Sequence, residues 1–175
     1  DSKGSLIANA PHIPVHLGSM DYSIKSLIKN NKKMIEGNFY AINDPYNGGT
    51  HLPDITVMCP VYFEGKDIVF FVAARGHHTD VGGISPGSMP SNSKSIEEEG
   101  IFIKNWLLVS DGKFKEKETR KLFSSSKYPA RSIDLNIADL KAQVAACEKG
   151  VNELKKMLTY YGTKKVKSFL IILRE

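Results

Sequence analysis

Histidine and aspartate side chains that could bind a metal ion are concentrated in one part of the sequence. His51 and Asp54 are separated by two residues, and His77, His78 and Asp80 follow together further along. Imidazole and carboxylate groups form sites for divalent ions without thiolate ligands. Any metal-assisted chemistry of this chain is therefore expected at these residues.

The elements between these motifs are expected to bring them together. Residues 55–63 and 68–74 are apolar and rich in β-branched residues, and residues 64–67 have the composition of a tight turn. This pattern predicts a β-hairpin, whose two arms place both motifs at the same open end. Asp44 is expected at that end too. We therefore treat the two motifs as one candidate site.

The adjacent histidines leave two arrangements open. Neighbouring residues of a strand point to opposite faces, so only one of His77 and His78 can face an ion if the strand continues through both. The other histidine would then support the site or carry a proton. If the chain has already become a loop at Gly76, both histidines can bind.

The remaining elements predict an α+β fold with a mixed β-sheet. The second arm of the hairpin is continuously apolar, which predicts a strand buried on both faces. An amphipathic helix should begin near Ser19 or Asp21 and end at Gly37. The other expected elements are strands at 5–8, 38–42 and 101–109, a turn at 111–112 and a short helix at 116–123.

A long helix ending at Gly162 is the clearest element near the C-terminus. It should begin at Asp134 or Asn136, and its apolar residues recur at alternating spacings of three and four. This apolar seam consists of Ile137, Leu140, Val144, Cys147, Val151, Leu154 and Leu158. The seam can pack on the sheet of its own chain or on a second polypeptide. Gly150 within the helix indicates close packing there.

Composition is typical of a globular protein. Of 175 residues, 41% are hydrophobic and 25% are charged, which argues against disorder. The apolar run at 169–173 is too short to cross a bilayer, so we expect no membrane association. Cys59 and Cys147 do not suggest a disulfide framework, and we expect free thiols in a cytoplasmic protein. The net charge of +5 arises in residues 89–175, but aromatic residues are not interleaved with the lysines, so we expect no nucleic-acid binding.

The segments that carry these motifs resemble the hydantoinase B/5-oxoprolinase family. The matching strings include Asp-Pro-Tyr-Asn-Gly-Gly-Thr-His-Leu-Pro-Asp at 44–54 and Arg-Gly-His-His-Thr-Asp at 75–80. The full similarities span 9–20, 43–57, 74–90, 96–100, 128–131 and 136–146. Family members are far longer than this chain, so the resemblance implies that residues 1–175 are the N-terminal part of a B-type module.

The resemblance also implies an activity, namely ATP-dependent hydrolysis of a cyclic amide. A hydantoinase A-type subunit or domain would use ATP and Mg²⁺ to phosphorylate the amide oxygen, and this module would complete the hydrolysis. The chain has no Gly-x4-Gly-Lys-Ser/Thr loop and no Gly-x-Gly-x-x-Gly turn, so we expect any nucleotide to bind elsewhere. By resemblance, His51, Asp54, His77 and His78 would bind a divalent Zn, Mn or Fe ion, with Asp80 and Asp44 as catalytic carboxylates.

Segments 96–100 and 129–146 are most similar to 5-oxoprolinases within the family. This implies 5-oxo-L-proline as substrate and L-glutamate as product, in glutathione metabolism. The alternatives are a hydantoin or N-methylhydantoin hydrolase subunit, an acetone-type carboxylase subunit and a docking module without catalytic activity. We expect a hetero- or homo-oligomer, and no activity from residues 1–175 alone.

Overall fold

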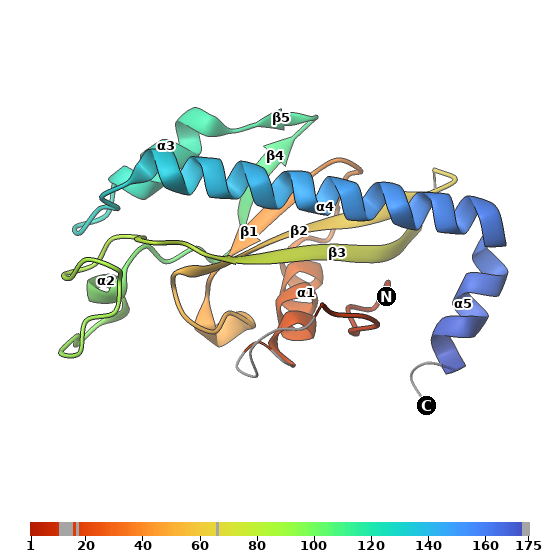
Figure 1. Ribbon diagram of the computed structural model, residues 1–175, viewed down its shortest axis with the longest axis horizontal. Coiled ribbons are helices and arrows are strands. Elements are labelled where there is room, and N and C mark those ends of the chain that lie inside the picture. The colour runs from red at the N-terminus through yellow and green to blue at the C-terminus, as the bar shows by residue number, and fades with distance from the viewer. Residues whose placement is uncertain (11–15, 17, 66, 173–175) are drawn as a thin grey trace.

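The structure, a computed structural model, describes residues 1–10, 16, 18–65 and 67–172 and is built on a five-stranded sheet (Figure 1). The strands are β1 (Phe39–Ile42), β2 (Asp54–Phe63), β3 (Asp67–His77), β4 (Trp106–Ser110) and β5 (Lys113–Phe114), in the order β3-β2-β1-β4-β5. The helices are α1 (Ser19–Asn30), η2 (Pro45–Asn47), α2 (Ile96–Glu99), α3 (Glu116–Ser124), α4 (Ile133–Tyr161) and α5 (Thr163–Ile172). The predicted α+β class is confirmed. All pairings among these strands are antiparallel, so the sheet is not mixed.

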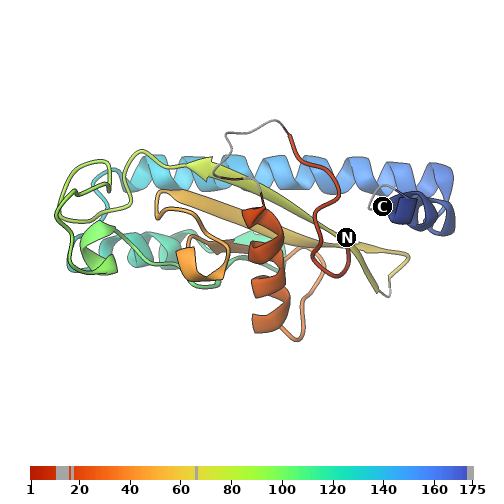
Figure 2. The same ribbon diagram turned by 90° about the horizontal axis from the view of Figure 1, so that it is seen from below.

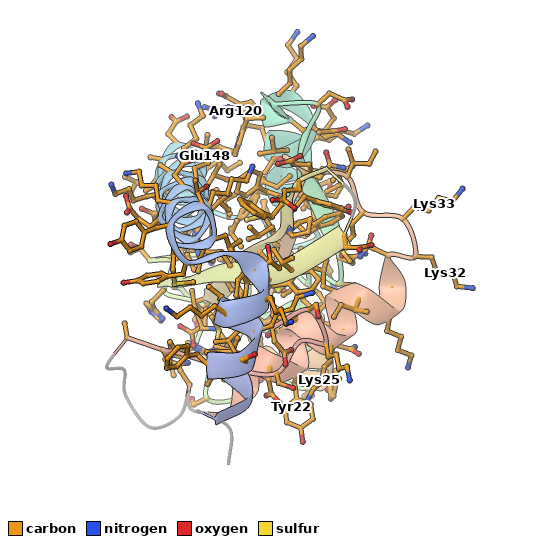
Figure 3. The ribbon with its side chains drawn as sticks, turned by 90° about the vertical axis from the view of Figure 1, so that its right-hand side faces the viewer. Tyr22, Lys25, Lys32, Lys33, Arg120 and Glu148 are labelled. Atoms are coloured by element: carbon orange, nitrogen blue, oxygen red, sulfur yellow. The ribbon has the colours of Figure 1, made fainter. Side chains whose placement is uncertain are left out.

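Helices cover both faces of the sheet. Helix α4 runs along one face and α1 lies across the other (Figures 1 and 2). A view along α4 shows the sheet between these two layers, with Tyr22 and Lys25 on the side of α1 that faces away from it (Figure 3). Side chains of β2 alternate between the layers, because Val57 packs with Leu140 and Cys147 whereas Met58 packs with Leu27.

The apolar seam of α4 packs on the sheet of its own chain. Leu140, Cys147 and Leu158 are at most 1% exposed. At Gly150, an added Cβ would lie 2.9 Å from Cγ1 of Val72, which confirms the close packing expected there. Gly162 ends the helix as predicted, although α5, which follows it, was not predicted. None of the helices in the described ranges combines the length and apolar character needed to span a membrane.

The β2–β3 hairpin is confirmed, but the burial predicted for its second arm is wrong. Strand β3 lies at an edge of the sheet, and β2, between β1 and β3, is the deeply buried strand. Apolar residues of β3 contact both layers, since Phe70 packs near α5 and Phe71 packs near α1. A continuous apolar run is therefore compatible with an edge strand whose two faces are partly covered.

Two other predicted boundaries and one predicted strand are wrong. Helix α1 ends at Asn30, not Gly37, because Asn31 leaves the helical region with φ −126° and ψ 88° and its side-chain Nδ2 donates to the carbonyl of Leu27. Residues 101–105 are outside β4, since the side chain of Asn43 donates to the carbonyl of Ile101 and accepts from the N–H of Ile103. Residues 5–8 form no strand.

Asp80 anchors the loop that follows β3. One carboxylate oxygen accepts from the backbone N–H groups of Gly82 and Arg131, and the other accepts from Gly87 and from Nη1 of Arg131 at 2.7 Å. Burial raises the pKa of Asp80, but these hydrogen bonds outweigh it and hold the pKa below its ordinary value of 3.8. The loop is thereby tied to the segment that leads into α4.

Replacement of Leu140 by alanine should destabilise the fold by about 2–5 kcal/mol, because it leaves a cavity between α4 and the sheet. Leu135 lies on the same helix but is 55% exposed, so Leu135→Ala is a matched control that should cost less than about 0.5 kcal/mol. Urea unfolding of both variants measures the difference. Equal losses would contradict the packing described for α4.

Replacement of Asp80 by asparagine should reduce stability at neutral pH by about 1–3 kcal/mol, because hydrogen bonds to a buried carboxylate are lost. The folded pKa lies below the unfolded value, so the contribution of Asp80 is present above about pH 4 and is lost as the pH falls further. Wild type should consequently lose more stability than Asp80→Asn between pH 5 and pH 2. Asp111→Asn, at an exposed turn, is the control for charge removal.

Candidate metal centre

Three of the four predicted ligands come together at the open end of the hairpin. The antiparallel register pairs Asp54 with His77, and Nδ1 of His77 lies 2.9 Å from Oδ1 of Asp54. The other carboxylate oxygen lies 3.1 Å from Nδ1 of His51 and accepts a hydrogen bond from Thr50. One coordinating atom from each of His51, Asp54 and His77 lies within 4.8 Å of the others. We call these three residues the His–Asp–His group.

The loop before β2 delivers His51 to this group. Asp44 is 2% exposed and shapes the loop, since its carboxylate accepts from the N–H of Tyr46 and from Nδ2 of Asn47. Gly48 has φ +95° and lies against α1, where an added Cβ would come within 2.2 Å of the backbone nitrogen of Ser23. Only glycine fits this close approach, which holds the loop beside α1.

His78 lies outside the group, on the α4 side of the sheet. Strand β3 continues through His77, so the arrangement in which only one of the two histidines faces the site is the one that forms. Nε2 of His78 contacts Oε1 of Gln143 at 3.1 Å, and Nδ1 contacts Nδ2 of Asn136 at 3.1 Å. The side chain is fully buried, which lowers the pKa of His78, although the hydrogen bond to Gln143 opposes this.

The partners of His78 fix its tautomer. Nε2 of Gln143 donates to the carbonyls of Ile55 and Ala74, so its Oε1 accepts a hydrogen bond from the N–H at Nε2 of His78. Asn136 donates to His78 through an amide that also donates to the carbonyl of Asp80. His78 thus joins α4 to the hairpin and lies outside the His–Asp–His group, and its role as a metal ligand remains a prediction.

The two predicted catalytic carboxylates also lie outside the group. Asp44 is engaged in the turn before β2, and Asp80 is engaged with Arg131 and the loop after β3. Both side chains therefore have structural partners, and their catalytic roles remain predictions.

The electrostatics of Asp54 suit a bound cation. Burial raises its pKa, but hydrogen bonds with His77, His51 and Thr50 outweigh burial, so the pKa lies below its ordinary value. An ionised carboxylate can only accept, so both imidazoles direct their Nδ1 protons at Asp54 and leave a lone pair on Nε2. Within the described structure, Nε2 of His51 is buried and has no hydrogen-bond partner.

The group therefore fits a divalent metal ion. The unpartnered nitrogen of His51 offers a lone pair to a cation while Asp54 orients the ring, an arrangement common among metal-binding histidines. A cation can instead bind between the carboxylate and the Nδ1 atoms, in place of the shared protons. Two imidazoles and one carboxylate are a donor set that Zn²⁺, Mn²⁺ and Fe²⁺ all accept.

Two residues beside the group were not assigned a role from the sequence. Arg75 lies two residues before His77 on the same face of β3, and it donates to the hydroxyl of Thr56 on β2. Nδ1 of His16 lies 3.4 Å from Oγ1 of Thr50, which in turn bonds Asp54. The two-residue spacing of Arg75 and His77 could have indicated that Arg75 lies on the same face as His77. Nothing in the sequence near His16 indicates its contact with Thr50.

Comparison with known proteins identifies relatives over nearly the whole chain. The 5-oxoprolinase of Dictyostelium discoideum is 48% identical over 168 residues, which are 95% of this chain and 13% of that protein. The caprolactamase subunit beta of Pseudomonas jessenii is 30% identical over 176 residues, covering 100% of this chain and 29% of the subunit. The crystal structure of the ATP-dependent caprolactamase from the same organism superposes with a TM-score of 0.81, at 31% identity over 92% of this chain and 27% of that one.

The chain thus spans only a small part of the relatives that it matches. The family model described as hydantoinase B/oxoprolinase matches residues 1–173. This match includes every residue of the His–Asp–His group and the helices on both faces of the sheet. The chain belongs to the hydantoinase B/oxoprolinase family.

Proposed function

We propose that this chain contributes a metal-assisted hydrolysis site to an ATP-dependent enzyme that opens a cyclic amide. The convergence of His51, Asp54 and His77 at the open end of the hairpin carries the proposal. The substrate we propose is 5-oxo-L-proline, with L-glutamate as product, because the 5-oxoprolinase relative is more similar to this chain than the caprolactamase subunit is.

In the proposed site, the two histidines of the group bind the ion and the aspartate orients the histidines. A divalent ion bound there would polarise the amide-derived carbon–oxygen system and lower the pKa of bound water. His51 and His77 would hold the ion, and Asp54 fixes both rings through its two oxygens. His78, from the opposite face, holds the strand that carries His77 in register.

The partner we propose is a hydantoinase A-type subunit or domain that uses ATP and Mg²⁺. The name of the caprolactamase relative, a subunit beta, supports an assembly of more than one kind of polypeptide. The small share of each relative covered supports the proposal that residues 1–175 are the N-terminal part of a larger B-type module. We further propose a cytoplasmic location, since Cys59 and Cys147 are both free thiols, as expected in a reducing compartment. The proposed role in glutathione metabolism follows from 5-oxo-L-proline as the proposed substrate.

The full-length protein should contain about one tightly bound divalent ion per chain, and His77→Ala and Asp54→Asn should remove it. Loss of a residue that only supports a ligand costs about 10- to 100-fold in metal affinity, so loss of a member of this group should cost at least about 100-fold. Elemental analysis after dialysis against a weak chelator measures the ion. Asp67→Asn, at the opposite end of the same hairpin, is the matched control and should retain the metal.

The complete assembly with its A-type partner should hydrolyse 5-oxo-L-proline only with ATP, and a strong chelator of transition metals should stop the reaction. Parallel assays with hydantoins test the hydantoinase alternative, and dependence on bicarbonate tests the carboxylase alternative. Unchanged hydrolysis in His51→Ala and His77→Ala, in a protein without bound metal, would instead favour a docking module and overturn the proposal.

A further inference from the structure

Arg75 is a cation on the same face of the hairpin as the His–Asp–His group. Successive residues on one face of a strand are about 7 Å apart, so Arg75 is the nearest neighbour of His77 along that face of β3. Thr56, the cross-strand partner of Arg75, holds the same position relative to Asp54 on β2. The guanidinium is half-buried, between the sheet and α1.

The guanidinium is oriented by four hydrogen bonds to neutral acceptors. Nε donates to the hydroxyl of Thr56 at 2.7 Å, Nη1 donates to the hydroxyl of Ser19, and Nη2 donates to the hydroxyl of Ser23 and to the carbonyl of Gly48. The hydroxyls of Ser19 and Ser23 donate their own protons to backbone carbonyls, so their lone pairs are available to Arg75. These contacts fix the plane of the guanidinium and leave one Nη1 proton without a partner in the described structure.

The charge of Arg75 is not neutralised by these contacts. Across the described part of the chain, no carboxylate lies within 4.0 Å of its nitrogens. Asp54 is the nearby carboxylate whose charge acts on it, but that carboxylate already accepts hydrogen bonds from His51 and His77. A partly buried cation that has no carboxylate in direct contact favours an anion that binds beside it.

Metal binding would increase the positive charge at this face. A divalent ion bound to the group would offset the charge of Asp54 and still leave an excess of its own beside Arg75. Because Arg75 and His77 are successive residues on this face of β3, a ligand that presents its reacting bond to the ion would have its anionic substituent on the side of Arg75. The remaining Nη1 proton of Arg75 can donate one charge-assisted hydrogen bond to an oxygen of a carboxylate or a phosphoryl group.

We propose that Arg75 recognises an oxyanion of the substrate bound at the His–Asp–His group. The proposal rests on the proposed function and makes Arg75 a specificity-determining residue of that site. The oxyanion is the carboxylate of the cyclic amide or the phosphoryl group that ATP adds to it. In both cases the role of Ser19, Ser23, Thr56 and Gly48 is to hold the guanidinium ready before the substrate arrives.

Calorimetric titration of the full-length, metal-loaded protein tests this with three probes. They are 5-oxo-L-proline, inorganic phosphate and 2-pyrrolidone, which has the same lactam ring without the carboxylate. Arg75→Gln should weaken the binding of 5-oxo-L-proline or of phosphate by about 10- to 150-fold, the equivalent of a charge-assisted hydrogen bond. Arg75→Lys should recover part of that loss, and the binding of 2-pyrrolidone should not change.

The pattern across the probes identifies the anion. A loss confined to 5-oxo-L-proline assigns Arg75 to the carboxylate, whereas a loss confined to phosphate assigns it to the phosphoryl group. Lys29→Gln, on the exposed side of α1, removes one positive charge away from the site and should bind all three probes as wild type does.

Two results would overturn the proposal. The first is unchanged affinity of Arg75→Gln for both anions, or no binding of either anion by wild type. The second is a parallel loss of metal, melting temperature and affinity for every probe, which would show that Arg75 only clamps α1 to the hairpin. Failure of the proposed function is distinguished separately, because it would appear in wild type as absent metal or absent ATP-dependent hydrolysis.

Discussion

The antiparallel pairing of Asp54 with His77 is the constraint on which the candidate site depends. These two residues face each other across β2 and β3. Because side chains of a strand alternate between the two faces of the sheet, this pairing determines which neighbouring side chains lie on the α1 face and which lie on the α4 face. Arg75 and His77 are directed to the face that carries α1, and His78 belongs to the face that carries α4. A slip of one residue would exchange the two histidines and dismantle the His–Asp–His group.

The opposite face of the sheet protects this register. Gln143 of α4 donates to carbonyls of both strands, Ile55 on β2 and Ala74 on β3, and accepts from His78 just beyond the end of β3. Because these are buried groups with defined donors and acceptors, a shifted strand would leave several of them unpaired, at a cost of about 1–3 kcal/mol each. The long helix therefore does more than cover the sheet, since its polar side chains hold the strand pair that positions the His–Asp–His group.

Local patterns in the sequence predict the hairpin, the long helix and its end at Gly162, because neighbouring residues determine them. Local patterns predict the structure wrongly where a residue distant in sequence determines it. Whether β3 is central or at an edge depends on which strands flank it. Residues 101–105 of the strand predicted at 101–109 lie outside β4, because Asn43, about 60 residues away, bonds the backbone there. Spacing and resemblance indicate His51, Asp54 and His77, but they cannot separate His77 from His78 until the strand is known to continue. Arg75 is missed because its partners Ser19, Ser23 and Gly48 lie far from it in sequence.

On one face of the hairpin, the proposed roles of Asp54 and Arg75 differ: Asp54 orients the two histidines, and Arg75 recognises an anion. Asp54 accepts from both imidazoles and thereby fixes the atoms that would hold an ion, a task that does not depend on which amide is opened. Arg75 contributes a charge that only an anionic ligand can use, and it is held by hydroxyls and a carbonyl that do not compete for that charge. A site of this kind can keep the same metal ligands for different cyclic amides, while the residues around the ion decide whether a charged or a neutral ring binds well. On this view, we expect the charges that surround the His–Asp–His group, and not the group itself, to select the substrate of this chain.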